Sequence, residues 1–428
     1  MQQPHFLVIT VGSLGDLYPF LSLALTLQQR GYQVTLLGLS YHAPIIQKAG
    51  IPFIGIGTDE DYLARIREPD LWHPIKGFQV FLRDYRRHLV HAYHCFQEFA
   101  CDQDYVVLAH PFALPSADLF RLHHPRTQVL AVHLAPASLR SCENPMQIGE
   151  IRVPNWLPMA VRKALWWLID TLLIDPAVVP EINAARQDCG LRPIKRFMRY
   201  LLKMPDANIL LFPKWFAPAR RDWGEHVIQG GFPLFEPNLQ QEMSSELLAF
   251  LAEGDAPIVF TPGTAHCHAA AYFRAALQAV QALGKRAIFL TQYPEQLPPD
   301  LPKTVHWQAY VPLRALLPAV AVVVHHGGIG TTAEALRAGI PQLVVPFAWD
   351  QFDNAIYIRA LGVGESIYAT RLKADGLIQK LQYLDASPVV RERCHAVMQQ
   401  FAQMPDMMQL CHMLEEYLRK NRIKDNHE

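Results

Sequence analysis

Two histidines, three glycines and two threonines stand together in the stretch HHGGIGTT, residues 325–332. The apolar run 319–324 before it is typical of a buried parallel strand, and the following TTAEALRAG favours a helix that ends near Gly339. A strand, a glycine turn and a helix in this order point unpaired backbone N–H groups and the positive helix end at one place. Such a place binds an anion, most often a phosphate.

Other turns and clusters exclude several chemistries. The turn GSLGD, residues 12–16, is not a GxGxxG pattern, and no acidic residue closes the next strand, so we do not expect a nicotinamide or flavin dinucleotide. The GGIGTT turn lacks the lysine of a P-loop, which argues against ATP hydrolysis. The segment HCH, residues 266–268, lacks further ligands at zinc spacing, and we expect DQD, residues 102–104, to be a surface loop.

The elements that must position these residues form two successive βα series. The first half predicts a helix over Tyr18–Arg30 and, after Val34–Gly38, a long region that is mainly helical. Two α/β halves predict an α/β fold of two doubly wound, Rossmann-like domains that face each other across a cleft. The expected strands are Phe6–Val11, Val34–Gly38, Tyr105–Ala109, Val129–His133, Ile209–Phe212, Ile258–Thr261, Ala287–Leu290, 319–324 and Gln342–Val345.

Glycine and proline cluster in GGFPLFE, residues 230–236, and we place the domain boundary there. The first domain then covers residues 1–232 and the second residues 250–404, with a helical segment over 405–428. A chain of 428 residues is long enough for two hydrophobic cores, and its zero formal net charge argues against nucleic-acid binding.

Cysteine usage and the N-terminus point to the cytoplasm. The seven scattered cysteines fit reduced thiols, and the start MQQPHFLVIT lacks the basic region of a signal peptide. The most apolar segment, Leu157–Asp175, is interrupted by Arg162, Lys163 and Asp170. We favour a largely buried helix here; the alternative is an apolar face for a lipophilic acceptor or for peripheral contact with the inner face of a membrane.

Three short motifs follow one another between His326 and Gln351: H-x-G-x-x-T-x-x-E, then G-x-P, then P-x-x-x-D-Q. Their order resembles the nucleotide-sugar signature of GT-B glycosyltransferases of the UDP-glycosyltransferase superfamily, family 1. The segment GSLGDLYPFLSLALTL resembles the first βα turn of that superfamily and of the family 28 N-terminal domain. The middle region is most similar to the rhamnosyltransferases of rhamnolipid synthesis. The resemblance implies a nucleoside-diphosphate sugar as donor substrate, with no cofactor and no metal ion.

The resemblance assigns the phosphate contacts. His326 contacts the donor diphosphate and offsets charge on the leaving group. Gly328 and Gly330 let backbone N–H groups approach the phosphates, and Thr331 adds a hydroxyl in the first helical turn. Thr264, in FTPGT after the first strand of the second half, is at a position that contacts phosphate in relatives.

The resemblance also assigns the rest of the donor. Glu334 lies one helical turn beyond Thr331 and is expected to accept from the ribose hydroxyls. Asp350 and Gln351 resemble the pair that binds the hydroxyls of the sugar, and Trp349 beside them is expected to face that sugar. His325 is interpreted as a buried core imidazole.

A base must take the proton of the attacking acceptor hydroxyl. Asp16 matches the catalytic position of the superfamily, although Leu14 stands where bacterial relatives often have arginine. The alternative for Asp16 is a helix N-cap; we favour the base because Ser13 can provide the cap. His110 follows the strand Tyr105–Ala109, at the position whose side chain orients the base in plant relatives; a structural role is the alternative.

Together these features predict an inverting transferase that moves a hexose, rhamnose or glucose, from a UDP- or dTDP-sugar to a hydroxyl of a small lipophilic acceptor such as a hydroxy-fatty acid or another lipid. The first domain holds the acceptor, the second the donor, and residues 405–428 return to the first domain as in relatives. Two rival functions are a nucleotide-sugar 2-epimerase on the same fold and a non-catalytic partner subunit that binds nucleotide sugar.

Overall fold

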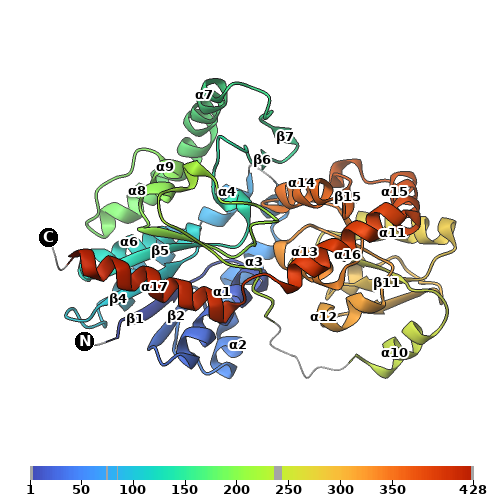
Figure 1. The fold of residues 1–428 in the computed structure, drawn as a ribbon, viewed down its shortest axis with the longest axis horizontal. Coiled ribbons are helices and arrows are strands. Elements are labelled where there is room, and N and C mark those ends of the chain that lie inside the picture. The colour runs from blue at the N-terminus through green and yellow to red at the C-terminus, as the bar shows by residue number, and fades with distance from the viewer. Residues whose placement is uncertain (1–2, 74–75, 84, 236–242, 426–428) are drawn as a thin grey trace.

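The computed structural model describes residues 3–73, 76–83, 85–235 and 243–425, which form two α/β domains (Figure 1). Each domain is built on one parallel sheet, with seven strands in the first and six in the second. The expected fold class of two doubly wound, Rossmann-like domains is confirmed.

The first sheet has the strand order β3-β2-β1-β4-β5-β8-β9, and all of its neighbouring pairs are parallel. The chain starts in the middle at β1 and moves outward in both directions, so the order reverses between β1 and β4. Loops that leave such a switch point diverge and open a crevice at the carboxyl ends of the strands. The strands are β1 (His5–Ile9), β2 (Val34–Leu39), β3 (Phe53–Ile56), β4 (Tyr105–Ala109), β5 (Thr127–His133), β8 (Ala207–Leu210) and β9 (Val227–Gln229).

Helices cover both faces of the first sheet, and a small antiparallel hairpin is added between β5 and α7 (Figure 1). The helices are α1 (Leu14–Gln29), α2 (Ala43–Lys48), α3 (Asp59–Arg67), α4 (Lys76–Leu82), α5 (Tyr85–Phe96), α6 (Leu114–His123), α7 (Met159–Ile169), α8 (Asp175–Asp188) and α9 (Phe197–Lys203). The π-helical segment η5 (Asp170–Ile174) joins α7 to α8, and the hairpin strands are β6 (Gln147–Ile148) and β7 (Ile151–Arg152).

The second sheet has the order β12-β11-β10-β13-β14-β15 and reverses between β10 and β13. Its strands are β10 (Ile258–Thr261), β11 (Ala287–Leu290), β12 (Val305–Gln308), β13 (Val322–His325), β14 (Gln342–Val344) and β15 (Gly364–Ser366). Its helices are α10 (Ser245–Ala252), α11 (Ala270–Leu283), α12 (Leu313–Leu316), α13 (Ile329–Ala338), α14 (Gln351–Leu361), α15 (Ala374–Ala386) and α16 (Pro388–Ala402).

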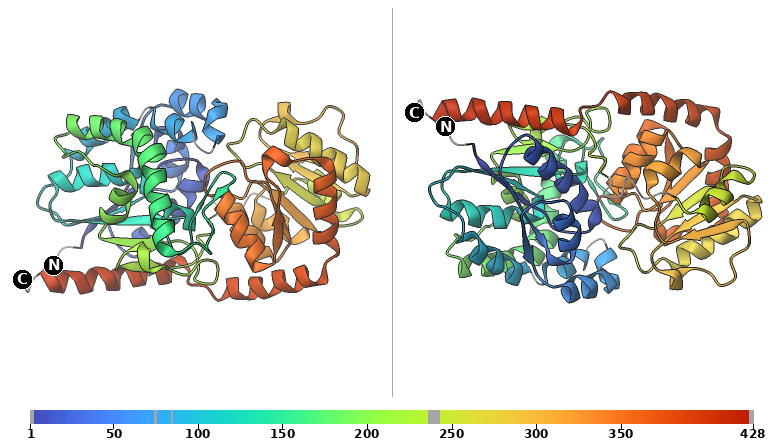
Figure 2. Two further views of the ribbon diagram at one scale, coloured as in Figure 1. Left: turned by 90° about the horizontal axis from the view of Figure 1, so that it is seen from above. Right: turned by 90° about the horizontal axis from the view of Figure 1, so that it is seen from below.

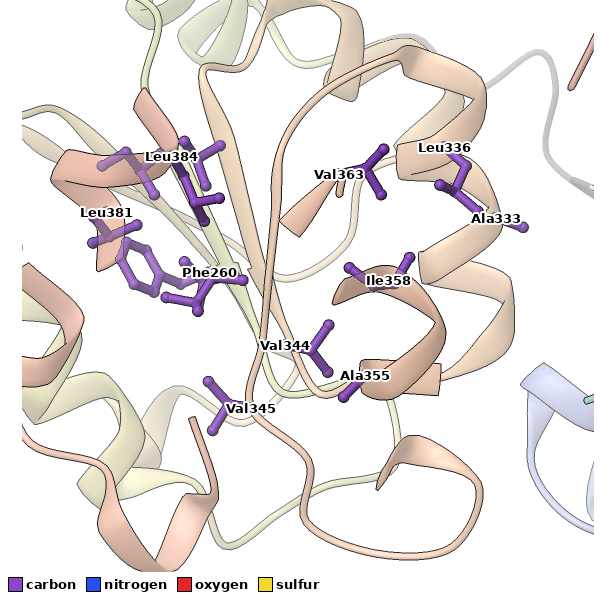
Figure 3. Close-up of a cluster of buried hydrophobic side chains, with 14 of the residues drawn as sticks. Phe260, Ala333, Leu336, Val344, Val345, Ala355, Ile358, Val363, Leu381 and Leu384 are labelled. Atoms are coloured by element: carbon purple, nitrogen blue, oxygen red, sulfur yellow. The ribbon is translucent and has the colours of Figure 1, made fainter. Parts of the chain in front are cut away.

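The core of the second domain lies between this sheet and the helices that follow its strands. Phe260 and Val344 project from the sheet and pack in one buried cluster with Leu336 of α13, Ile358 of α14 and Leu381 of α15 (Figure 3). This close packing holds the helices against the sheet. It therefore fixes the loops between strands and helices, where the site residues lie.

The last helix, α17 (Met407–Asp425), leaves the second domain and runs along the first, beside α1 (Figure 2). Leu410 and Leu414 are buried in the core of the first domain. The guanidinium of Arg30 donates from Nε and Nη2 to the two carboxylate oxygens of Glu415, each at 2.6 Å. The chain therefore connects the domains twice; of the other connection, residues 236–242 lie outside the described residues.

The start of α1 differs from the prediction, which began the helix at Tyr18. The helix begins at Leu14, because Ser13 caps it and Asp16 completes a capping box with the backbone of Ser13. Pro19 lies inside the helix, where a proline in the sequence favours a later start.

The prediction of a largely buried helix within Leu157–Asp175 is wrong. In α7 only Trp166 is buried, whereas Trp167 and Leu168 are exposed. Figure 1 shows the reason: α7 stands out from the body of the first domain and has neighbours on one side only. Within the described ranges, no helix is both long and apolar enough to cross a lipid bilayer.

Candidate active site

The turn between β13 and α13 presents an uncapped helix start. Gly328 is the N-cap residue and has no side chain to satisfy the first backbone N–H groups of α13. His325, at the end of β13, is fully buried; its Nδ1 accepts from the N–H of Gly327, so its Nε2 donates to the amide oxygen of Gln342 at 3.0 Å. The interpretation of His325 as a core residue is confirmed, and the anion site belongs to the residues after it.

His326 lies at the mouth of α13 with its ring between two glycines. A Cβ on Gly263, in the turn after β10, would lie 2.8 Å from Cε1 of His326, and a Cβ on Gly328 would collide with Nε2. Burial lowers the pKa of His326 to about 4, so the imidazole is neutral near pH 7. Its Nδ1 is buried without a hydrogen-bond partner among the described residues. A ligand oxygen at this ring would satisfy a polar atom that is otherwise costly to bury.

The other predicted phosphate residues surround the same turn. Gly330 is exposed and a Cβ there would meet nothing within 4 Å, whereas Thr331 is half-buried in the first turn of α13. Thr264 is exposed and follows Gly263 in the neighbouring turn. The structure thus brings these residues to the switch point of the second sheet, whereas Gly328 serves first to make room for the ring of His326.

Glu334 is one turn further along α13. Its Oε2 accepts from Nε of Arg337 at 2.7 Å, and the carboxylate is largely buried. Arg337 also donates to the backbone oxygen of Arg314, so α13 is tied to α12 beside the site. The ribose contact assigned to Glu334 stays a prediction.

Asp350 and Gln351 begin α14 next to the β13 turn. Asp350 is the N-cap residue, and its Oδ2 accepts from the amide of Asn354 at 2.8 Å. The Oε1 of Gln351 accepts from the backbone N–H groups of Phe347 and Ala348, at 2.8 and 3.0 Å. The side-chain oxygen of Gln351 therefore stabilises the 347–350 loop. The contact of its side-chain nitrogen with a sugar hydroxyl stays a prediction.

Trp349 connects this loop to the first domain. Its ring lies 5.3 Å from Phe78, 6.3 Å from Phe81 and 6.4 Å from Phe112, measured between centroids. Its φ of 59° is in the left-handed region, which costs about 1–3 kcal/mol for a side chain of this size. The aromatic packing keeps the loop in this conformation at the domain interface. The expected contact of Trp349 with the sugar stays a prediction.

Asp16 lies at the switch point of the first sheet. Its Oδ2 accepts from the backbone N–H of Ser13 at 2.8 Å and closes the capping box, which leaves Oδ1 for other partners. Gly12 has a φ of 112°, and a Cβ there would collide with the carboxylate of Asp16. Burial raises the pKa of Asp16 to about 6, although the Ser13 hydrogen bonds lower it. One oxygen of Asp16 is thus structural and the other is free to accept a proton.

His110 faces that second oxygen. Its Nδ1 accepts from the N–H of Phe112 at 3.3 Å, so the neutral ring carries its hydrogen on Nε2, 3.9 Å from Oδ1 of Asp16. This distance exceeds a hydrogen bond. Burial, with a smaller contribution from His133, lowers the pKa of His110 to about 3. His110 is therefore a neutral neighbour of Asp16 that can orient the carboxylate after a small shift.

The two switch points face each other. Burial raises the pKa of Asp350 to about 6, and the negative charge of Asp16 contributes to the rise. A carboxylate of the first domain is therefore close enough to one of the second to affect its ionisation. Asn354 links Asp350 to the turn before α13, because its amide donates both to Asp350 and to the backbone oxygen of Gly327, each at 2.8 Å.

His266 is a site residue that the sequence analysis considered only for metal binding. It is 4% exposed, and its ring packs 4.2 Å from Phe347 and 4.6 Å from Trp72. Neither of its ring nitrogens has a partner among the described residues, and burial, with the nearby His326, lowers its pKa to about 3. The signal in the sequence was its position two residues after Thr264. Its neighbour His268 instead donates to the backbone oxygen of Arg67, across the domain interface.

Comparisons with known proteins agree with this geometry. The family 28 glycosyltransferase N-terminal domain matches residues 6–101, and the C-terminal domain of erythromycin biosynthesis protein CIII-like proteins matches residues 276–417. The chain is 26% identical over 430 residues to O-mycaminosyltylonolide 6-deoxyallosyltransferase of Streptomyces fradiae, with 96% of each protein covered. It is 25% identical over 400 residues to a sterol 3-beta-glucosyltransferase of Arabidopsis thaliana, which covers 88% of this chain and 62% of that protein.

Solved structures show the same fold. The glycosyltransferase of kitacinnamycin superposes with a TM-score of 0.74 at 20% identity, covering 97% of this chain and 99% of that one. A spinosyn rhamnosyltransferase in complex with thymidine diphosphate superposes with a TM-score of 0.65 at 18% identity, covering 96% and 100%. The fold is therefore GT-B. The chain belongs to the GT-B glycosyltransferase superfamily, and it is an enzyme of the hexosyltransferase class.

Proposed function

We propose that the chain is an inverting glycosyltransferase that moves a hexose from a nucleoside-diphosphate sugar to a hydroxyl of a small lipophilic acceptor. The observation that carries the proposal is the position of Asp16 opposite the donor loop: burial raises the pKa of Asp350, and the charge of Asp16 adds to the rise. Asp16 takes the proton of the acceptor hydroxyl, which attacks the anomeric carbon while the nucleoside diphosphate leaves toward α13. The acceptor hydroxyl attacks from the side of the first domain and the nucleoside diphosphate leaves toward the second, so the configuration at the anomeric carbon is inverted.

The leaving diphosphate gains negative charge, and the chain offers it neutral donors rather than a metal ion. These are the first backbone N–H groups of α13 and the imidazole of His326. The side chains of Asp350 and Gln351 are proposed to hold the sugar hydroxyls. A dTDP-sugar is favoured over a UDP-sugar, because one relative of the same fold binds thymidine diphosphate.

The lipophilic acceptor is supported by two relatives, whose names give a tylonolide and a sterol as acceptors. A cavity at the carboxyl ends of β1 and β2, lined by Phe81 and Phe112 but also by Arg65, has a volume of only about 40 Å³ and is too small to hold such an acceptor. We also propose that the acceptor is a hydroxy-fatty acid or another lipid and that the donor sugar is rhamnose, as in rhamnolipid synthesis. In this proposal the protein works in the cytoplasm, at the inner face of the membrane.

The deciding experiment is a donor panel. Thermal unfolding with UDP-glucose and dTDP-rhamnose is expected to raise Tm with one donor, followed by product formation with that donor and a hydroxylated lipid. Consumption of donor without any acceptor, yielding an epimerised sugar nucleotide, would instead identify an epimerase. Donor binding with no turnover for any acceptor would identify a binding subunit.

Replacing Asp350 with asparagine is expected to raise the KM for the sugar nucleotide by about tenfold, the scale of a lost hydrogen bond to a charged group. The affinity for the free nucleoside diphosphate should stay unchanged, because Asp350 lies at α14 and not at the α13 turn. Calorimetric titration with diphosphate and sugar nucleotide measures both. An equal loss for the two ligands would move Asp350 from the sugar to the phosphates.

The pH dependence of transfer follows from the raised pKa of Asp16. Only the ionised carboxylate accepts a proton, so kcat/KM is expected to fall as the pH drops through about 6. Asp350 titrates in the same pH range, so this acidic limb of the pH–rate profile, where kcat/KM falls, belongs to the two coupled carboxylates together. In Asp350→Asn the limb should move to lower pH, because a neighbouring negative charge has been removed. A limb that stays in place would show that the two carboxylates do not interact.

Removal of divalent ions is expected to leave the rate unchanged, because the proposed charge stabilisation comes from α13 and His326. The test is the transfer rate after treatment with EDTA and again after addition of excess Mg²⁺. A rate that falls with the chelator and returns with the metal would contradict this account of the leaving group.

A further inference from the structure

The surface around α7 is unusually apolar for an exposed part of the molecule. Of the fourteen large hydrophobic side chains that are exposed in the described part of the chain, six fall between Trp156 and Leu173. Apolar patches of this kind mark an interaction site, because an isolated soluble domain gains nothing by exposing them. The six residues, which we name the α7 surface, are Trp156, Val161, Trp167, Leu168, Leu172 and Leu173.

The inner face of α7 is firmly attached, so the α7 surface is held outward. Trp166 is buried and the guanidinium of Arg140 stacks over its ring at 4.3 Å. Arg140, itself 7% exposed, also pairs with Asp170 at the end of the helix. Arg162 donates to the backbone oxygens of Cys142 and Glu143. These polar contacts hold the inner side of α7, and the six apolar side chains of the α7 surface stay exposed.

The π-helical segment η5 extends this outer face. Leu172 and Leu173 lie in this segment, between α7 and α8, and are exposed at 62% and 50%. The apolar face therefore continues past the end of α7.

Positive charge borders the α7 surface. Lys163 is exposed on α7, and Lys195 and Arg199 are exposed on either side of Arg196, whose guanidinium lies 5.1 Å from the ring of Trp167. Two carboxylates next to the α7 surface are paired within the domain: Asp170 pairs with Arg140, and Asp175 pairs with Arg196 at 3.0 Å. Glu181, an exposed carboxylate of α8, acts on Arg86, and Lys163, Lys195 and Arg199 provide the positive charge of the border.

We propose that the α7 surface docks on a bilayer that contains anionic phospholipids. Exposed tryptophans beside leucines, with lysine and arginine at the border, match the two layers of such an interface, apolar chains beneath and anionic headgroups above. A second copy of the chain would bring the same cations against each other, so the charge favours lipid. At eleven residues, α7 is about 16 Å long and lies on the bilayer without spanning it.

The inference does not depend on the proposed sugar or acceptor, because vesicle binding requires no reaction. The experiment is co-sedimentation of the full chain with phosphatidylcholine vesicles and with vesicles that also contain phosphatidylglycerol. The parent is expected to bind the anionic vesicles in preference to the neutral ones. The double variant Leu172→Ser, Leu173→Ser should bind them about tenfold less. The matched control is Leu248→Ser, since Leu248 is exposed to 49% on α10 of the other domain.

A charge variant, Lys163→Glu with Lys195→Glu, keeps the apolar side chains and should lose the preference for anionic vesicles. Tm and nucleotide affinity of each variant establish that it is folded. Parent protein that binds neither vesicle, or apolar variants that bind like the parent, would overturn the proposal. So would a parent dimer that the leucine variant converts to monomer in sedimentation velocity, without vesicle binding, because a second copy would then cover the α7 surface.

Discussion

Replacing Asp16 with asparagine is expected to slow glycosyl transfer by about two to four orders of magnitude, the usual effect of losing a general base. Asparagine keeps the side-chain oxygen that accepts from the N–H of Ser13, so the capping box and the start of α1 should persist. What is lost is the free Oδ1 oxygen, whose proton affinity burial has raised to suit neutral pH. Initial rates at saturating donor and acceptor measure the loss.

The affinity for nucleotide should be nearly unchanged in Asp16→Asn, because the donor groups belong to the second domain. Asp102→Asn, on an exposed loop of the first domain, is the matched control and should transfer like the parent. Retained activity in Asp16→Asn would overturn the assignment of the base to Asp16 and move it to His110, which would then have to carry its hydrogen on Nδ1 so that Nε2 can accept. Loss of nucleotide binding would show instead that Asp16 shapes the cleft.

Replacing His326 with alanine is expected to raise the barrier to transfer by about 2–4 kcal/mol, the range for one preorganised donor at a developing negative charge. The ring is fixed between Gly263 and Gly328, so it needs little reorganisation when the diphosphate leaves. Because burial lowers its pKa to about 4, it acts as a neutral hydrogen-bond donor until the diphosphate binds. The measurement is single-turnover kinetics with the preferred donor.

His326→Gln should recover part of the lost rate, since its amide N–H can reach the same oxygen, whereas a purely structural role would not distinguish the two variants. His395→Ala, exposed on α16, is the control for loss of a histidine elsewhere in the second domain. Unchanged kinetics of His326→Ala at saturating acceptor would exclude the imidazole from leaving-group stabilisation.

The inner strands were predictable from the sequence, and the edge strands were not. The nine expected strands correspond to β1, β2, β4, β5, β8, β10, β11, β13 and β14, which are the inner strands of the two sheets. Inner strands of a parallel sheet are covered on both faces, and their sequences are therefore continuous apolar runs. The strands β3, β9, β12 and β15, which form the four sheet edges, were not predicted. An edge such as Val305–Gln308 is short and partly polar, so no apolar run marks it.

The local part of the site was also determined by the sequence. A strand, a glycine turn and a helix are specified within a few residues, so His326 at the helix mouth and Ser13 as the cap before Asp16 could be placed from the residue order. The distinction between His325 in the core and His326 at the helix mouth followed from spacing, because His326 and Thr331 are spaced as a phosphate site requires.

Only the tertiary structure decided which distant residues meet and which apolar residues stay exposed. The influence of Asp16 on Asp350 and the packing of Trp349 on Phe78 depend on the relative position of two domains, which no local pattern encodes. The α7 surface is the clearest case, since an apolar helix has the same composition whether it is buried or exposed. Burial depends on whether another element covers the helix, and α7 has a partner on one side only.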